Sequence, residues 1–511
     1  MLNLVVLVLT LLVIYLLIKY HKRSTSTPPG PAGYPLVGNL LQIGARPHLS
    51  YTRWAKMYGG IYRIKIGSTN MFILTSTSLV KEAFNTGLEL SGRMEIKSIR
   101  DIFDDAAITH GVNGADGESW NILRRFTLQQ LHNMGYAGKR IEEYILDEVR
   151  HMLGEIEESN GKPVKDIMET FSLPVVSSLW RVITGERLTR GDAEFQKMLG
   201  MVRRAIDAMV GKGSILFLLP WIRHVAPESS GYNNFRQIMG ELRDFFVGVV
   251  SRHEKNLDNS PPSFRGHLLQ EFINPFDVTF SNMVQAFLQQ IHNTSDKDSH
   301  FYGDLGKRHL VATMFDIIEG GYFALTTAIS WSLLYLAVFT EVQDKVREET
   351  NNIVAKGEQC RLSDRSRMPY TQATIAEIHR FSSVTAMGVP HRAVESKNVG
   401  KYMIPKGSLI IHNIYGIHMD EEIWGDPTTF RPTRFLNPTT NEYIMNENLM
   451  PFSFGKRQCF GKSFANDTIF LFITNILKQY TVSTVGDVTL EPEVAFALYP
   501  KPFALKFEKL I

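Results

Sequence analysis

The chain has 511 residues, of which 44% are hydrophobic and 21% are charged. This balance is typical of a folded globular protein and excludes a wholly disordered or collagen-like chain. The formal net charge of only +3 argues against a general nucleic-acid-binding protein, which would carry a strongly basic surface. Two cysteines, Cys360 and Cys459, are too few for a disulfide framework and indicate a reducing compartment.

The N-terminus begins with an apolar run. Residues 2–18 contain no charged side chain, and Lys19, Lys22 and Arg23 follow directly. The run just reaches the length of about 17 residues that a short spanning helix needs, and basic residues stay on the cytoplasmic side. A cleaved signal peptide would instead carry basic residues before the run and a small-residue cleavage site after it. The pattern therefore predicts that 1–23 form an uncleaved membrane anchor with a basic stop segment.

A segment rich in proline and glycine follows the anchor, STSTPPGPAGYPLVG from residue 24 onward. Proline restricts the backbone and removes a hydrogen-bond donor, so we expect residues 24–48 to form a stiff connector. The rest of the chain contains no internal repeat, no second membrane-spanning run and no convincing domain boundary. Residues 49–511 are therefore predicted to form one large catalytic domain.

Most of that domain has helical periodicity. The clearest helical stretches are 118–155, 190–212, 232–256 and 305–350. The strand-like runs are fewer and shorter, at 61–67, 71–76 and 408–417. The polar, proline-broken stretch 257–300 predicts a surface connection. The expected fold class is mainly α with a small β region.

The most informative segment surrounds the second cysteine. It places Phe452, Gly455, Arg457, Cys459 and Gly461 within ten residues. Glycines on both sides permit a tight turn and the close approach of a flat ligand, and an arginine could meet an anionic group of that ligand. The apolar stretch that follows reads as a helix, whose N-terminus would stabilise a thiolate. Such a loop can present one thiolate to a metal.

The spacing F-x-x-G-x-R-x-C-x-G, matched at every fixed position, resembles the cysteine loop of the cytochrome P450 family of haem-thiolate enzymes. The resemblance extends over about residues 28–511 and implies the cytochrome P450 fold behind an N-terminal anchor helix. It also implies haem b (iron protoporphyrin IX) as the cofactor, with Cys459 as the axial ligand of the iron.

Further motifs of that family occur in the expected order. Glu377 and Arg380 match its E-x-x-R helix, and the two side chains share one helix face. By resemblance, they form a structural charge network with Arg434.

The haem edge is assigned by the same resemblance. Trp120 and Arg124 match the family's propionate-binding helix, where an indole N–H and a guanidinium at i and i+4 can meet one carboxylate. His391, in a Pro-His-Arg segment, resembles a residue that contacts the same propionates. With Arg457, Phe452 and Gly461, these residues are the predicted cofactor-binding set around Cys459.

The predicted oxygen-activating helix departs from the family pattern, (A/G)-G-x-(D/E)-T. Gly320 and Gly321 match, and we attribute them to room above the haem. Phe323 occupies the position of the acid and Ala324 that of the threonine. Glu319 lies one turn before Phe323 and could serve as a displaced acid; it could equally be paired or solvated. Glu319, Gly320, Gly321 and Ala324 are the candidate catalytic residues.

Three functions remain open. The first is a membrane-bound monooxygenase that uses O2 and electrons from an NADPH-dependent reductase. The second is a haem-thiolate isomerase or dehydratase that needs no reductase. The third is a ligand-binding haem protein without turnover. Residues 320–324 also resemble the Spook-type enzymes of arthropod ecdysteroid synthesis, which implies a sterol or steroid-like substrate. The anchor favours the endoplasmic reticulum, with the catalytic domain in the cytosol.

Overall fold

The fold was analysed in a computed structural model. It describes residue 10 and residues 27–67, 69–85, 87–94, 110–134, 139–210, 216, 221–258 and 282–510. The predicted membrane anchor therefore lies outside the described residues, apart from Thr10.

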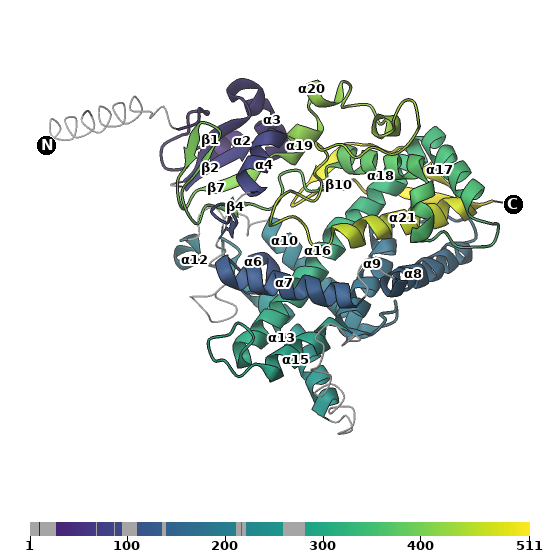
Figure 1. The fold of residues 1–511 in the computed structure, drawn as a ribbon, viewed down its shortest axis with the longest axis horizontal. Coiled ribbons are helices and arrows are strands. Elements are labelled where there is room, and N and C mark those ends of the chain that lie inside the picture. Colours follow the sequence, from purple (N-terminus) through teal and green to yellow (C-terminus); the bar gives the residue numbers. More distant parts are fainter. Residues whose placement is uncertain are drawn as a thin grey trace.

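Helices make up most of the described chain, as the periodicity predicts (Figure 1). In the N-terminal half they are α2 (Leu40–Ile43), α3 (Pro47–Tyr58), α4 (Thr77–Asn85), α6 (Gly111–Gly114), α7 (Gly117–Asn133), α8 (Lys139–Glu158), α9 (Ile167–Thr184), α10 (Ala193–Val210), α12 (Ile222–Val225) and α13 (Tyr232–Asp258). In the C-terminal half they are α15 (Met283–Asn293), α16 (Gly303–Val338), α17 (Thr340–Ile353), η1 (Leu362–Arg367), α18 (Pro369–Ser382), α19 (Ile414–His418), α20 (Glu421–Trp424), η2 (Pro432–Phe435) and α21 (Lys462–Gln479).

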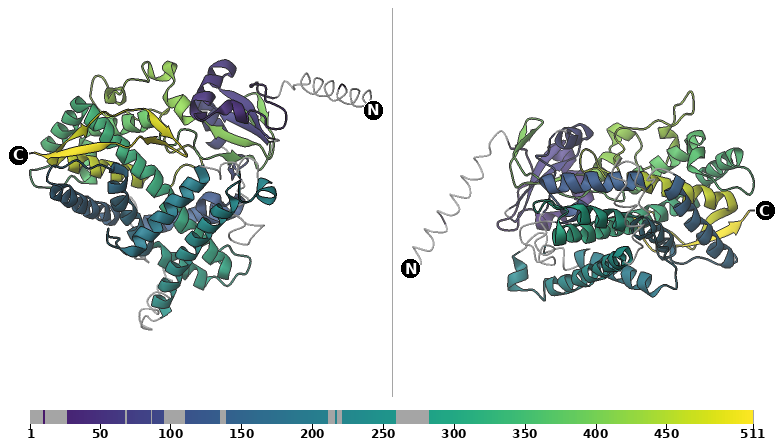
Figure 2. Two further views of the ribbon diagram at one scale, coloured as in Figure 1. Left: turned by 180° about the vertical axis from the view of Figure 1, so that it is seen from behind. Right: turned by 60° about the horizontal axis from the view of Figure 1, so that its bottom comes forward.

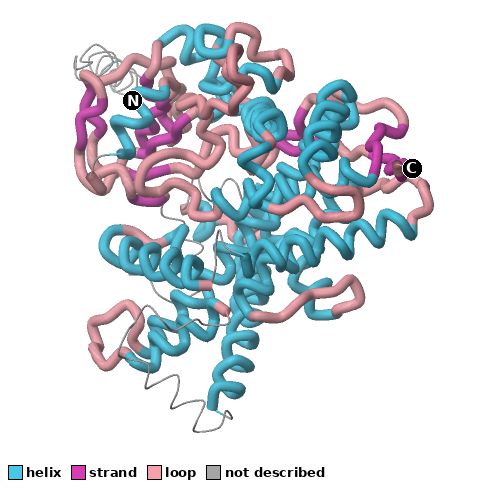
Figure 3. Tube along the Cα trace, turned by 45° about the vertical axis from the view of Figure 1, so that its right-hand side comes forward, coloured by secondary structure: helices cyan, strands magenta, loops and turns pink. Residues whose placement is uncertain are grey.

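The strands gather at two edges of the helical body (Figure 3). The larger sheet has the order β1-β2-β7-β4-β3. Its strands are β1 (Ile61–Ile66), β2 (Thr69–Leu74), β3 (Gly92–Arg93), β4 (His391–Arg392) and β7 (Leu409–His412). The remaining strands form pairs: β5 (Lys397–Val399) with β6 (Tyr402–Ile404), β8 (Tyr480–Val485) with β11 (Ala504–Lys509), and β9 (Pro492–Val494) with β10 (Leu498–Pro500).

The larger sheet joins distant parts of the sequence. β2 pairs in parallel with β7, and β3 pairs antiparallel with β4. This arrangement brings the segment around Arg93 beside the segment around His391. The described part of the predicted connector also lies against this sheet, because the Arg63 N–H donates to the Pro29 carbonyl and Gly38 bridges to Ile66.

Helix α16 runs through the middle of the molecule, and α9, α6, α15, α18 and α21 pack around it (Figures 1 and 2). It is the one helix among the described residues that is long and apolar enough to cross a membrane. Its apolar window is 83% buried inside the protein, so the apolar composition is explained by its central position in the core.

Four stretches differ from the sequence-based expectation. The strand-like run 408–417 forms β7 only up to His412 and then continues as α19. The helical stretch 118–155 contains two helices, α7 and α8. The helical stretch 305–350 is divided at Phe339, whose backbone leaves the helical region with ψ of 70°. The stretch 257–300 contains α15, whose apolar residues Met283, Phe287 and Ile291 are buried in the main core or against it. The prediction of a surface connection was therefore wrong for this helix, because apolar residues at i, i+4 and i+8 bury one face.

Candidate active site

Cys459 lies on a tight turn immediately before α21. Its backbone N–H donates to the carbonyl of Phe452 at 3.0 Å. Gly455 has φ of 78°, and a Cβ there would lie 2.1 Å from the carbonyl oxygen of Phe84. Only glycine fits this position, so the turn is held against α4 by a close backbone approach.

The surroundings of the Cys459 thiol have opposing effects. The side chain is exposed, yet the protein around it raises the pKa of the thiol by desolvation. A hydrogen bond from the Gly461 backbone and the positive charge of Arg124 act in the opposite direction. Arg124 is fixed beside the turn because its Nη2 donates to the Gln458 carbonyl at 2.6 Å. The Gly461 backbone N–H and the Arg124 guanidinium can therefore both stabilise a thiolate at Cys459.

Trp120 and Arg124 project from α7 toward this turn. Trp120 is 2% exposed, and its Nε1–H has no hydrogen-bond partner in the described part of the chain. The guanidinium of Arg457 lies 4.0 Å from the Trp120 ring centroid, and that of Arg124 lies 5.9 Å from it. A buried indole N–H without a partner is costly, so this atom marks a place where an acceptor belongs.

Arg457 is buried among backbone carbonyls. Its Nε donates to the Ser91 carbonyl at 2.8 Å, and its Nη2 reaches the Ala115 carbonyl and the Asp116 carboxylate. Burial and the neighbouring Arg93 lower the pKa of Arg457 to about 8. Burial disfavours the charged guanidinium, and the positive charge of Arg93 adds to that effect.

Asp116 carries most of the balancing negative charge. It forms ion pairs with Arg392 and Arg457, and it accepts the backbone N–H of Arg93. In addition to the effect of burial, the charge of Arg124 lowers the pKa of both Arg93 and Arg457. This excess of cations fits a ligand with more than one carboxylate.

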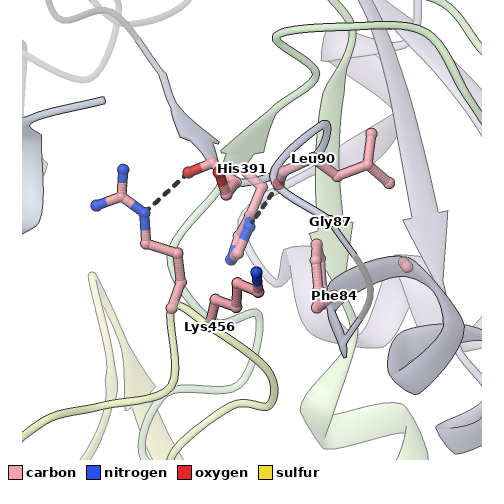
Figure 4. Close-up of a pocket in the computed structure, with 8 residues that line it drawn as sticks. Phe84, Gly87, Leu90, His391 and Lys456 are labelled. Atoms are coloured by element: carbon pink, nitrogen blue, oxygen red, sulfur yellow. Dashed lines mark hydrogen bonds between the residues drawn. The ribbon is translucent and has the colours of Figure 1, made fainter. Parts of the chain in front are cut away.

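His391 and Arg457 line one recess. The His391 Nδ1 pairs with the Leu90 carbonyl at 2.9 Å (Figure 4). Burial holds the pKa of the ring well below its usual value. The ring lines this small recess, with Lys456 beside it (Figure 4). The other lining residues are Ala83, Phe84, Gly87, Leu90, Ser91 and Arg457.

The residues present fit a haem. A thiol on a glycine-bounded turn can ligate iron from one side, while the unpaired Trp120 N–H and the crowded arginines can meet the two propionates. Among the described residues there is no group of three or more histidine, cysteine or acidic side chains placed to hold a metal ion directly.

Comparison with protein-family models matches residues 28–507 to the family described as cytochrome P450. The chain belongs to the cytochrome P450 family. This confirms the resemblance carried by the cysteine loop. As a cytochrome P450, the protein is a haem b enzyme of the monooxygenase class.

Curated relatives align over nearly the full length. The farnesoate epoxidase of Bombyx mori is 29% identical over 99% of this chain and 98% of its own. The probable cytochrome P450 305a1 of Drosophila melanogaster is also 29% identical, over 97% of each chain. Cytochrome P450 2F2 of Rattus norvegicus is 30% identical over 94% of this chain and 93% of its own.

The predicted catalytic residues of this cytochrome P450 lie at the middle of α16. A Cβ on Gly320 would meet nothing within 4 Å, whereas a Cβ on Gly321 would lie 2.1 Å from Leu179 Cδ1 of α9. Ala324 is half-buried and lies one turn after Gly320. Gly320 therefore borders open space, whereas the missing side chain of Gly321 lets α9 pack closely. The attribution of the pair to room above the haem stays a prediction.

Glu319 lies beside a second carboxyl on the same helix. Burial raises the pKa of Glu319 to about 7, and burial with repulsion from Glu319 raises that of Asp316 to about 8. Asp316 Oδ2 accepts the Asn113 N–H at 2.8 Å. Phe323, at the family's acid position, packs edge-on against Phe496 and Tyr499.

The E-x-x-R residues form the network that the resemblance implies. Both carboxylate oxygens of Glu377 accept from Arg380, at 2.7 and 2.8 Å, and one accepts from Arg434 Nε at 3.1 Å. Glu377 and Arg380 are completely buried. The Arg380 guanidinium also donates to the carbonyls of His418 and Pro427.

Sequence reasoning missed Arg93 and Asp116. Arg93 lies in β3 and is half-buried. Its Nη1 donates to the Val389 carbonyl at 3.3 Å, just before His391. Neither residue lies in a motif with fixed spacing to Cys459. Their place in the site depends on the pairing of β3 with β4 between distant parts of the sequence, which no local pattern signals.

Proposed function

We propose that this protein is a membrane-bound monooxygenase that oxidises a hydrophobic sterol or steroid-like substrate. It would take electrons from an NADPH-dependent reductase at the cytosolic face of the endoplasmic reticulum. The observation that carries the proposal is the cysteine turn, with its thiol beside Arg124 and the crowded arginines. The apolar N-terminal run followed by basic residues supports the membrane location.

Each part of the site has a separate task in this proposal. The haem, when bound, supplies the oxygen chemistry, and a thiolate ligand favours O–O cleavage. Cys459 provides that ligand, while Trp120, Arg124, His391 and Arg457 hold the anionic edge. Gly320 leaves room for substrate beside α16.

Glu319 is proposed as the displaced proton donor. The residues that normally share this task are replaced by Phe323, which packs among aromatic rings, and Ala324, which has no hydroxyl. Thr327 does not replace them, because its hydroxyl donates to the Phe323 carbonyl at 2.7 Å. A carboxyl with a pKa near 7 suits proton transfer at neutral pH.

A second candidate substrate is farnesoate, because the Bombyx mori relative that aligns over nearly the whole chain is a farnesoate epoxidase. Spectral titration of the haem with a sterol and with farnesoate distinguishes the two. A saturable spectral shift and an oxidised product with one ligand alone would select it, and product from neither would contradict both assignments.

The first experiment is the carbon monoxide difference spectrum of the reduced protein, for the wild type and Cys459→Ser. We expect the absorption band of a thiolate-ligated haem in the wild type and its loss in the variant. A folded, haem-loaded wild type without that band would contradict the thiolate assignment.

Turnover with and without NADPH and reductase then separates the three functions. Strict dependence on both supports the monooxygenase. Product formation without them indicates an isomerase or dehydratase. A ligand-induced spectral shift without any product indicates a binding protein.

A further inference from the structure

His412, the last residue of β7, is an unsatisfied buried histidine. Its side chain is 0% exposed, and neither ring nitrogen has a hydrogen-bond partner in the described chain. Buried polar side-chain atoms nearly always have a partner, and an unsatisfied one needs an explanation. Two other buried histidines are satisfied: His379 pairs with Asn466, and His418 pairs with Ser383 and the Met450 N–H.

The ring of His412 lies beside the haem-edge residues. Its centroid is 5.9 Å from that of His391 and 5.4 Å from that of Phe84, both with nearly perpendicular rings. Phe84 in turn lies 4.1 Å from His391. Arg93 is near enough for its charge to act on both histidines.

The backbone around Gly388 adapts to this ring. A Cβ on Gly388 would lie 2.3 Å from His412 Cε1 and 2.5 Å from Nε2, and Gly388 has φ of 57°. The loop that leads into His391 therefore passes directly over the nitrogen-bearing edge of the ring. Any side chain at position 388 would displace the ring, so the glycine and the histidine act as a pair.

The charge state of the His412 ring determines how many hydrogen-bond donors it has. Burial and the neighbouring Arg93 lower the pKa of His412 to about 3. The ring is therefore neutral at physiological pH and keeps one N–H donor. Arg93 Nε also has no partner among the described residues, so two unsatisfied donors lie in the same neighbourhood as the His391 ring.

We propose that His412 is an additional cofactor-binding residue, whose ring N–H donates to the haem propionate held by Arg93 and His391. The propionate satisfies the donor that the protein leaves unpaired. Because Gly388 has no side chain, the ring keeps its position beside the loop that leads into His391. The proposal rests on the haem site described above.

The test compares haem retention in His412→Leu, which fills the volume without a donor, and His412→Gln, which keeps an N–H. A matched control is His48→Leu: His48 is also a buried histidine with an unpaired Nδ1, but it packs against Tyr415 and not against the haem-edge residues. Transfer of haem from each holoenzyme to excess apomyoglobin gives the rate of loss. Resonance Raman spectra report the propionate bending modes.

We expect His412→Leu to lose haem about tenfold faster than the wild type, since a hydrogen bond to a charged group is lost. His412→Gln should lie between them, and His48→Leu should match the wild type. The propionate mode should shift in His412→Leu only. Unchanged haem loss and unchanged propionate modes in His412→Leu or, if it fails to fold, in His412→Phe would overturn the proposal. A wild type that folds but takes up no haem would instead contradict the proposed function.

Discussion

Gly320 and Gly321 are neighbours in the chain but meet different constraints. Gly320 borders open space, while Gly321 allows Leu179 of α9 to approach the helix backbone. A glycine inside a helix costs about 1 kcal/mol relative to alanine, so each needs a compensating reason. The sequence shows the pair, and the structure shows that the two reasons differ.

Substitution of each glycine by alanine should distinguish the open space at Gly320 from the close helix packing at Gly321. Gly320→Ala should fold with equal or higher stability and reduce substrate binding, because the added methyl group enters the open space. Gly321→Ala should be less stable than Gly320→Ala by about 1–3 kcal/mol, because a well-packed contact becomes overfilled. Urea unfolding measures the difference, and equal stability of the two variants would contradict the packing explanation.

Glu319 predicts a specific dependence of stability on pH. The native carboxyl keeps its proton up to about pH 7, whereas the unfolded one releases it near its usual value of 4.5. The native state therefore binds more protons in this window, and the free energy of unfolding falls as pH rises through it. The pKa of Asp316 is raised as well, so Asp316 adds to this pH dependence of stability and keeps part of it when Glu319 is replaced.

In Glu319→Gln this loss of stability should be reduced. The variant should be more stable than the wild type above about pH 7, with the difference disappearing below about pH 4. Urea unfolding at a series of pH values measures it, with Glu348→Gln on the exposed face of α17 as the control. Parallel curves for the wild type and Glu319→Gln would show that the carboxyl is not buried in the folded protein.

Helix α18 is tied to η2 by the ion pair of Glu377 with Arg434, which has little access to water. Arg434 is 5% exposed and joins Glu377 to Asp426 and to the carbonyls of Trp424 and Thr429. Such a pair contributes little net stability when complete, but removal of one partner leaves a buried charge unbalanced. At the scale of elements, this network fixes the irregular segment that precedes the cysteine turn.

Arg434→Ala should therefore lower the free energy of unfolding by about 3–5 kcal/mol. Arg431→Ala is the matched control, because the Arg431 side chain is half-exposed and its ion pair is with Asp426. Its loss should cost about 1 kcal/mol or less. Denaturant unfolding with haem content as a second readout checks both, and similar losses in the two variants would contradict the role of the buried network.

At the scale of the whole molecule, α10 is linked to the core by a polar contact. It packs chiefly against α13. Arg203 of α10 donates from Nε to Tyr322 Oη of α16 at 2.9 Å and also pairs with Glu169 of α9. Tyr322 is 8% exposed, so its hydroxyl ties α10 to the central helix just beside Gly321.

Tyr322→Phe should loosen α10 without unfolding the protein. The lost hydrogen bond is worth about 1 kcal/mol, so amide hydrogen exchange in α10 should accelerate several-fold, while exchange in α21 stays unchanged. Arg204→Gln, which breaks the exposed pair of α10 with Glu241 of α13, is the control. Unchanged exchange in α10 of Tyr322→Phe would show that packing alone holds this helix.

The sequence by itself determined the chemistry of the site and the helical character of the fold. The cysteine turn and the E-x-x-R pair lie within short segments, where spacing along the chain fixes spacing in space. The apolar periodicity likewise predicts helices, although it did not reveal the break at Phe339.

Only the tertiary structure decided which distant residues complete the site. Arg93, Asp116 and His412 reach it through strand pairing and loop packing between segments far apart in the chain. The structure also decided that Gly321 serves helix packing and that Cys360, in a polar stretch, is fully buried. These outcomes depend on neighbours brought together by folding, and the local sequence carries no record of which neighbour each residue will meet.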